Sequence, residues 1–224
     1  MNKPEIIYEN RRDAGIKLAE KLTAFKNTPV VVLAIPNGGV PIALEVAKSL
    51  ENAEFDVVIS RKIPMPLSPE GGFGAIADDG TMILNEEIAK SIGLTMTQID
   101  YEANKVRAEI KKRTLLYRGN RPLTRVIGKV VIIIDDGLAS GITMKAALSS
   151  IRHRAPREII VAVPTASTTG LAMVSGTADK VITGATSAPP YAVADYYRHW
   201  YDVSDEDVVR FLDQWRSRHL MRQS

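Results

Sequence analysis

The sequence of 224 residues contains no cysteine, and this absence excludes several kinds of chemistry. A protein without cysteine has no disulfide framework, no cysteine-ligated zinc and no cysteine nucleophile. Long apolar runs are also missing, because no stretch approaches the roughly 20 apolar residues that a membrane-spanning helix needs. Residues 1–13 lack the apolar segment of a secretory signal. We therefore expect a cytoplasmic protein with no membrane partner.

Neither the charge nor the histidine content favours a nucleic-acid or metal-binding protein. The formal net charge of +3 is small and evenly spread, so nucleic acid is not an expected partner. The histidines at 153, 199 and 219 are isolated and form no metal-binding cluster. No P-loop, G-x-S-x-G motif or dinucleotide-binding fingerprint occurs. The length and composition fit one globular α/β domain with a small appendage.

The most informative stretch is residues 130–144, VVIIIDDGLASGITM. Its first five residues are all β-branched, as in a strand buried on both faces. Asp135 and Asp136 follow where this strand would end, and a loop of small residues then leads into helix-forming residues 144–148. Ligands of open α/β sheets bind beyond the carboxyl ends of the strands, and a helix start offers free N–H groups to an anion. This stretch therefore predicts a phosphate site beside a pair of carboxylates.

Each feature of this stretch also has an ordinary explanation. An acidic pair at a strand end is usually a solvated turn, and Ser140 before Gly141 is compatible with a plain helix N-cap. Their combination favours a ligand site, because two like charges beside a buried strand repel each other unless a cation or hydroxyl donors are present.

A second strand-to-helix turn carries a Gly-Gly pair. Residues 30–35 predict a buried strand, PNGGVP follows at 36–41, and residues 42–50 predict a helix. Gly38 and Gly39 allow a ligand to approach the backbone, although a plain tight turn has the same pattern. The next expected strand, residues 56–60, is followed by Arg61 and Lys62, which would place two cations at the same edge of the sheet.

The following segment is rich in proline and glycine. Residues 64–74 contain three of each, and we expect them to form an irregular, mobile loop rather than a regular element. Residues 75–84 predict a short hairpin that turns at Asp79-Gly80 in a type I′ geometry. Asp78 and Asp79 are interpreted as turn residues. The flexible loop as a whole is expected to cover about residues 64–82.

The remaining pattern alternates helices and strands, which predicts a parallel sheet with helices on both faces. A core of residues 1–183 would be followed, in the same domain, by an aromatic hood segment and a closing helix at 184–224. Tyr191 is either part of a small aromatic core or a platform on which a planar base stacks. The other expected elements are helices over 11–25, 85–90, 95–117, 171–175 and 202–218, and strands over 158–163 and 179–183.

Residues 130–144 resemble the phosphoribosyl pyrophosphate (PRPP) signature of type I phosphoribosyltransferases, a hydrophobic strand followed by two acidic residues and a Thr/Ser-Gly-x-Thr loop. The resemblance implies that Asp135 and Asp136 hold the ribose hydroxyls and Mg²⁺. It also implies that the 5′-phosphate is held by Ala139, Ser140, Gly141, Ile142 and Thr143. Residues 12–15, 36–41, 61–62, 117–119 and 205–208 further resemble poorly characterised stand-alone phosphoribosyltransferases of bacteria and archaea.

The resemblance also implies a pyrophosphate site and a catalytic loop. The pyrophosphate would be bound by Asn37, Gly38, Gly39, Arg61 and Lys62. Relatives often carry Arg or Lys at the position of Asn37, so Lys62 is expected to supply charge that Asn37 lacks. Lys62 and Glu70 are the candidate catalytic residues, with Glu70 in the loop that relatives close over the substrate.

The implied function is transfer of the 5-phosphoribosyl group of PRPP to a nitrogenous base, with release of pyrophosphate. A non-catalytic PRPP- or nucleotide-binding regulator is the alternative, and a nucleotide-binding interaction module is a third possibility. The expected partners are PRPP, a small base and, as an option, a second copy of the chain. Relatives that act on 6-oxopurines carry Asp at the position of Ala139, whereas this loop resembles that of adenine phosphoribosyltransferases.

Overall fold

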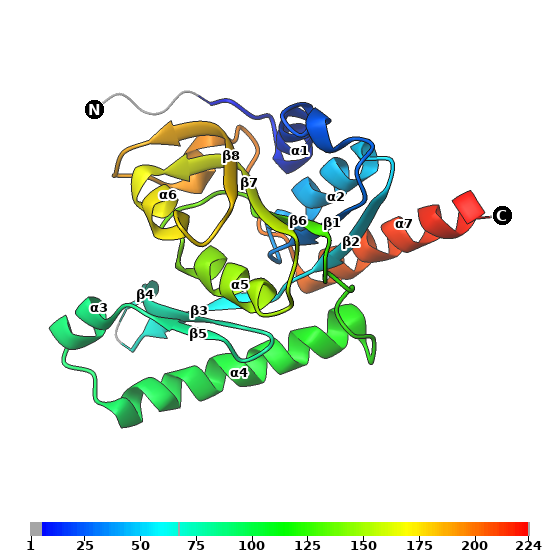
Figure 1. Cartoon of the computed structure of the whole chain (residues 1–224). Helices are drawn as coiled ribbons and strands as arrows, with labels where there is room; N and C mark the ends of the chain where they lie inside the picture. The colour runs from blue at the N-terminus through cyan, green and yellow to red at the C-terminus, as the bar shows by residue number, and fades with distance from the viewer. Residues whose placement is uncertain (1–5, 67, 224) are drawn as a thin grey trace.

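The computed structural model describes residues 6–66 and 68–223, and it describes their side chains except at 69, 70 and 219–223. The main feature is a parallel sheet of five strands (Figure 1). In the order in which they lie side by side, the strands are β2 (Ala53–Val57), β1 (Val30–Ala34), β6 (Val130–Ile134), β7 (Glu158–Ser167) and β8 (Lys180–Ser187). The predicted parallel sheet flanked by helices is confirmed.

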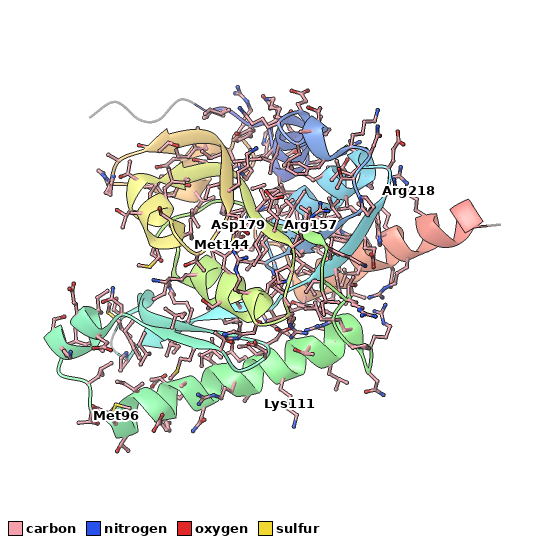
Figure 2. The ribbon with its side chains drawn as sticks, viewed as in Figure 1. Met96, Lys111, Met144, Arg157, Asp179 and Arg218 are labelled. Carbon is pink, nitrogen blue, oxygen red and sulfur yellow. The ribbon has the colours of Figure 1, made fainter. Side chains whose placement is uncertain are left out.

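Every residue of β1 and β6 is buried, because helices cover both faces of the sheet. Successive residues of each strand point to opposite faces, so Val32 and Ile132 join one core cluster and Val31 and Ile133 join the other. The first cluster packs against α1 (Arg11–Glu20), α2 (Gly39–Ser49) and α7 (Asp205–Gln223), and the second against α5 (Ile142–Arg152) and α6 (Thr168–Val174). Figure 2 shows side chains filling the space beside α5, where Met144 is fully buried.

The segment predicted to be an irregular loop is instead part of a three-stranded antiparallel sheet, so this prediction was wrong. The strands are β3 (Ser60–Met65), β4 (Ser68–Ala77) and β5 (Met82–Leu84). Pro64 is tolerated because β3 is an edge strand and its register shifts there. Gly72 provides space for the stem of Lys62, which a side chain at Gly72 would overlap. The segment therefore presents Arg61 and Lys62 from a strand rather than from the end of β2.

The hairpin between β4 and β5 is confirmed, but its turn is not of type I′. Among the described residues at this turn, only Gly80 has a positive φ, of 91°, and its N–H donates to Ala77 O at 2.9 Å. Asp78 was interpreted as a turn residue, whereas its side chain is 3% exposed and is ion-paired with Arg118, which is 6% exposed. The pair joins the end of β4 to the end of α4 (Met96–Arg118).

The two predicted helices after this hairpin are confirmed, as α3 (Glu86–Ser91) and α4. Asn85 caps α3 by accepting the Ile88 N–H at 3.0 Å, and Thr95 and Gln98 form a capping box at the start of α4. Helix α4 lies along the three-stranded sheet, and α5 lies between this sheet and the main one (Figure 1). No helix in the described part of the chain is long and apolar enough to cross a membrane.

The two ends of the chain differ in detail from the sequence prediction. The first helix ends at Glu20 and is followed by the short 3-10 helix η1 (Thr23–Phe25). Strand β8 continues four residues past 183, to Ser187, and Gly184 within it leaves room for the Tyr8 hydroxyl because it has no side chain. The hood segment then contains η2 (Val193–Tyr196), and the predicted closing helix is α7.

Breaking the buried pair of Asp78 and Arg118 should destabilise the fold. Burial raises the pKa of Asp78, and Arg118 opposes that rise, so Arg118→Met should leave a buried carboxylate without its partner. We expect a loss of about 3–5 kcal/mol in the free energy of unfolding at pH 7. Because the unfolded Asp78 loses its proton at lower pH than the folded one, the loss should shrink as the pH falls toward 4.

Urea unfolding at both pH values measures this loss. The double variant Asp78→Asn with Arg118→Met should recover part of it, because neither charge is then left alone. A loss in the single variant that is equal at the two pH values would contradict the assignment to Asp78.

Candidate active site

The two loops predicted to bind ligand lie side by side because β1 and β6 are neighbours in register. Ala34 pairs with Ile134, so the turn after β1 and the acidic pair after β6 begin at the same level of the sheet. A Cβ on Gly39 would come within 2.7 Å of Ile134 O, and a side chain on Gly38 would overlap the Asp136 carboxylate. The Gly-Gly pair is therefore required by the close contact of the two loops.

The two carboxylates of the acidic pair are half-buried, and they have different surroundings. Arg11 binds Asp136 Oδ2 through Nε at 3.0 Å and Nη2 at 2.9 Å. Asp135 Oδ1 accepts only the Asp136 N–H, at 2.8 Å, among the described residues. Burial raises the pKa of Asp135 well above its ordinary value, and the charge of Asp136 raises it further. Burial also raises the pKa of Asp136, against the opposing charge of Arg11.

Arg11 is a residue that the sequence prediction missed. Its side chain is 3% exposed, its Nη1 donates to Tyr201 O at 2.6 Å, and its guanidinium stacks 3.7 Å from the centre of the Trp200 ring. The Tyr197 hydroxyl donates to Asp136 O at 2.7 Å. The hood segment and α1 therefore hold the strand end together, and the Arg-Arg pair at the start of a helix was the only sequence signal for this role.

The loop for which phosphate binding was predicted, residues 139–143, leads into α5, and this order of loop and helix is as expected. Gly141 has a φ of 78° and begins the helix without a side-chain cap, and the Ser140 hydroxyl lies 3.5 Å from the Ile142 N–H. Within the described chain, the N–H groups of Ala139, Ser140 and Gly141 have no hydrogen-bond partner. These groups and the first N–H groups of α5 suit an anion. A Cβ at Gly141 would meet Gly170 O at 2.8 Å, so the loop is packed against α6.

Ser167 supports the same loop from the end of β7. Its hydroxyl donates to Ala139 O at 2.5 Å and accepts the Gly170 N–H at 2.8 Å, which confirms the predicted N-cap of α6.

One cavity of about 460 Å³ brings residues from four parts of the sequence together. Asp135 and Thr143 line it from the signature, and Arg61 and Lys62 line it from β3. Its other lining residues are Ile35, Pro36, Ser60, Pro64, Glu102, Lys105, Val106 and Glu109. The Ser60 hydroxyl donates to Thr143 O at 2.9 Å and so ties the second sheet to the phosphate loop. The cavity thus has a carboxylate and a helix start on one side and cations on another.

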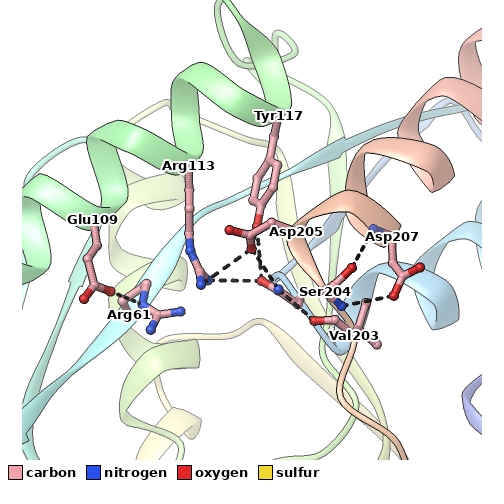
Figure 3. A network of polar contacts seen from close by, with 9 residues as sticks. Arg61, Glu109, Arg113, Tyr117, Val203, Ser204, Asp205 and Asp207 are labelled. Carbon is pink, nitrogen blue, oxygen red and sulfur yellow. Dashed lines mark hydrogen bonds and ion pairs between the residues drawn. The ribbon is translucent and has the colours of Figure 1, made fainter.

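Asn37 has a different role from the one its position suggested. Its side-chain amide donates to Val203 O at 2.9 Å and to Asp205 Oδ1 at 3.0 Å, at the start of α7 (Figure 3). The Gly39 N–H donates to Ile35 O at 3.2 Å within the turn. Among the described residues, the N–H groups of Asn37 and Gly38 have no partner and are the ones open to an anion.

The two remaining candidate residues are Tyr191, which is not among the residues that line this cavity, and Glu70. Tyr191 is half-buried, its hydroxyl lies 3.3 Å from the Thr165 hydroxyl, and its ring packs against Tyr196 with 5.6 Å between centroids. A Cβ on Gly137 would lie 3.0 Å from the Tyr191 hydroxyl, which places this ring beside the acidic pair. The Glu70 side chain lies outside the described residues.

The described residues contain no group of three or more His, Cys, Asp or Glu side chains that could hold a metal on its own. Mg²⁺ commonly binds one or two carboxylates together with substrate oxygens. Asp135 fits that role because Asp136 already binds Arg11. The donors present therefore suit an ion that arrives with a polyanionic substrate.

Comparison with known proteins agrees with this architecture. Residues 5–192 match the family model described as a phosphoribosyl transferase domain. The chain belongs to the phosphoribosyltransferase family. A Mycobacterium tuberculosis protein, provisionally named a phosphoribosyl transferase, is 38% identical over 208 residues, which cover 93% of this chain and 47% of that protein. The chain thus spans about half the length of the first curated relatives it matches.

Solved structures have a similar fold. The protein TT1426 from Thermus thermophilus superposes with a TM-score of 0.76 at 36% identity, over 93% of this chain and 99% of that one. A hypoxanthine phosphoribosyltransferase from Staphylococcus aureus superposes with a TM-score of 0.50 over 84% of this chain and 78% of that one. It is 12% identical, so this second likeness concerns the fold alone.

The two carboxylates should respond in opposite directions to the same substitution. Because burial and Asp136 raise the pKa of Asp135, its ionised form costs stability at neutral pH. Asp135→Asn should therefore raise the melting temperature at pH 7 by several degrees, and the gain should vanish as the pH falls to about 4. Asp136→Asn should instead lower the free energy of unfolding by about 3 kcal/mol, because the buried Arg11 loses its partner.

Thermal unfolding of both variants between pH 4 and pH 8 measures the difference. If the two variants melt at the same temperature at pH 7, the carboxylates do not differ as described.

Proposed function

We propose that this protein is a PRPP-dependent phosphoribosyltransferase that acts on a nitrogenous base. The observation that carries this proposal is the cavity that Asp135 and Thr143 share with Arg61 and Lys62. Carboxylates suit the hydroxyls of a ribose, a helix start suits its 5′-phosphate, and cations suit a departing pyrophosphate. These three requirements are met around a single space, beyond the carboxyl ends of β1 and β6.

In this reaction a base nitrogen forms a bond to C1 of the ribose as the bond from C1 to the pyrophosphate oxygen breaks. The leaving group keeps the electron pair of that bond, and the base loses a proton. Asp135 would orient the ribose, and the Ala139 to Thr143 loop would hold the 5′-phosphate in place. Arg61, Lys62 and the N–H groups of Asn37 and Gly38 would stabilise the charge that develops on the pyrophosphate.

Bound Mg²⁺ would supply further neutralisation of the pyrophosphate charge. Tyr191 would contact the base, since it lies beside the acidic pair. Glu70 stays the candidate for accepting the proton of the base. A cytoplasmic location and a homodimer also stay predictions.

A non-catalytic PRPP- or nucleotide-binding regulator is the second candidate. Two observations favour it: Asn37 brings no charge to the pyrophosphate turn, and Arg11 already neutralises one carboxylate of the pair. Such a protein would bind PRPP and leave it intact. Arg61 and Lys62 line the cavity and would serve both candidates, because intact PRPP carries the same pyrophosphate. Membership of the phosphoribosyltransferase family favours the catalytic proposal.

The test is to incubate the protein with PRPP and Mg²⁺ against a panel of bases and to follow pyrophosphate release. Release that depends on one base supports the transferase. Binding of PRPP by calorimetry without release from any base would favour the regulator, and failure to bind PRPP would contradict both.

The acceptor should not be a 6-oxopurine. Ala139 stands where relatives acting on such bases carry an aspartate, and a methyl side chain cannot accept a proton from the base. Hypoxanthine and guanine should therefore react at least about 100-fold more slowly than the preferred base, since general base catalysis contributes roughly that much. Rates of nucleotide formation measured base by base give the answer. Fast turnover of hypoxanthine or guanine would remove the argument from Ala139.

A further inference from the structure

The pyrophosphate turn carries no charged side chain of its own, but a cation from another element contacts it. Arg113, on α4, donates through Nη1 to the Asn37 side-chain oxygen at 3.1 Å. The Tyr117 hydroxyl, one turn further along the same helix, lies 3.2 Å from the same oxygen. Both groups reach the turn from 76 to 80 residues away in the sequence (Figure 3).

The start of α7 fixes this arrangement. Asp205 Oδ1 accepts from Tyr117 at 2.6 Å and from Asn37 at 3.0 Å, and lies 3.5 Å from Arg113 Nη2. Each member of this group therefore contacts two others, so the side chain of Asn37 has little freedom. The conformation of the turn depends on the same group.

A second arginine lies beside the group and lines the cavity. Arg61 Nε is 3.3 Å from Glu109 Oε2, and Glu109 is 57% exposed. Such an exposed ion pair is weak and can exchange for a stronger anion. Burial and the nearby charge of Arg113 both lower the pKa of Arg61, while Glu109, Tyr117 and Asp205 oppose this effect. Figure 3 shows the side chains of Arg61 and Arg113 next to each other, so both guanidinium groups could act on one anion.

We propose that Arg113 supplies the charge that Asn37 lacks and positions the turn for pyrophosphate. This inference rests on the proposed function. Arg113 acts on the turn through the Asn37 side chain, so it is a positioning residue. Arg61 lines the cavity, and Arg113 adds a second positive charge beside the turn that carries the Asn37 and Gly38 N–H groups. Asp205 holds Arg113 in place and offsets part of its charge.

The first experiment measures binding of pyrophosphate and, separately, of ribose 5-phosphate by calorimetry in the presence of Mg²⁺. Arg113→Gln removes the charge and keeps a donor for the Asn37 oxygen. We expect it to bind pyrophosphate about tenfold more weakly, a loss between those of one charge pair in bulk water and near a protein surface, and to bind ribose 5-phosphate as the wild type does. Arg113→Lys should retain most of the affinity.

Lys112→Gln is the matched control, because it removes the same charge from an exposed neighbour on the same helix. It should change neither affinity by more than about twofold. Equal effects of Arg113→Gln and Lys112→Gln, or equal losses of both ligands in Arg113→Gln, would overturn the inference.

A second variant tests the charge argument without touching Arg113. Asp205→Asn keeps an oxygen that can accept from Tyr117 and from Asn37 but removes a negative charge. We expect pyrophosphate to bind about threefold more tightly and ribose 5-phosphate to bind unchanged. Weaker pyrophosphate binding would mean that the group only supports the fold, which would overturn the inference.

The wild type separates this inference from the proposed function. If it binds neither pyrophosphate nor ribose 5-phosphate, the proposed function fails and the inference fails with it. If it binds both and Arg113→Gln binds them equally well, the inference alone is overturned.

Discussion

The fold must accommodate two adjacent carboxylates, Asp135 and Asp136, at the end of a fully buried strand, and it does so with one ion pair. Arg11 neutralises Asp136, and it is itself held by Tyr201 O and the Trp200 ring. A guanidinium buried to this degree is stable only with such partners. One ion pair therefore connects the first helix, the central strand and the hood segment. It also leaves Asp135 as the carboxylate whose charge a ligand would compensate.

The parallel sheet was predictable because each of its strands is marked by a pattern of neighbouring residues in the sequence. Runs of β-branched residues with turn residues behind them identify β1 and β6, and the acidic pair and Gly141 stand where the pattern placed them. The β3–β4 hairpin was missed because its proline and glycine content suggested an irregular loop. That content is compatible with a strand only when its partner is known, as with Gly72 beneath Lys62. Residue composition alone does not show which strand pairs with which.

The parts of the candidate site that escaped prediction are those made by contacts distant in sequence. Arg11 meets Asp136 across 125 positions, and Arg113 meets Asn37 across 76. In the sequence both arginines are ordinary charged residues of amphipathic helices, where a solvated face is the usual explanation. Asn37 was correctly singled out as a turn residue without charge, but the group that surrounds it depends on how α4 and α7 pack.

The bond between Asn37 and Asp205 spans 168 positions and has a consequence for how the protein is made. Ribosomes deliver the N-terminal part first, and domains fold as units during synthesis. A nascent chain that has not yet reached α7 has the five strands of the main sheet but lacks the contact that fixes the Asn37 side chain. The turn between β1 and α2 would then reach its final conformation only after α7 has emerged and docked, later than the strands on either side of it.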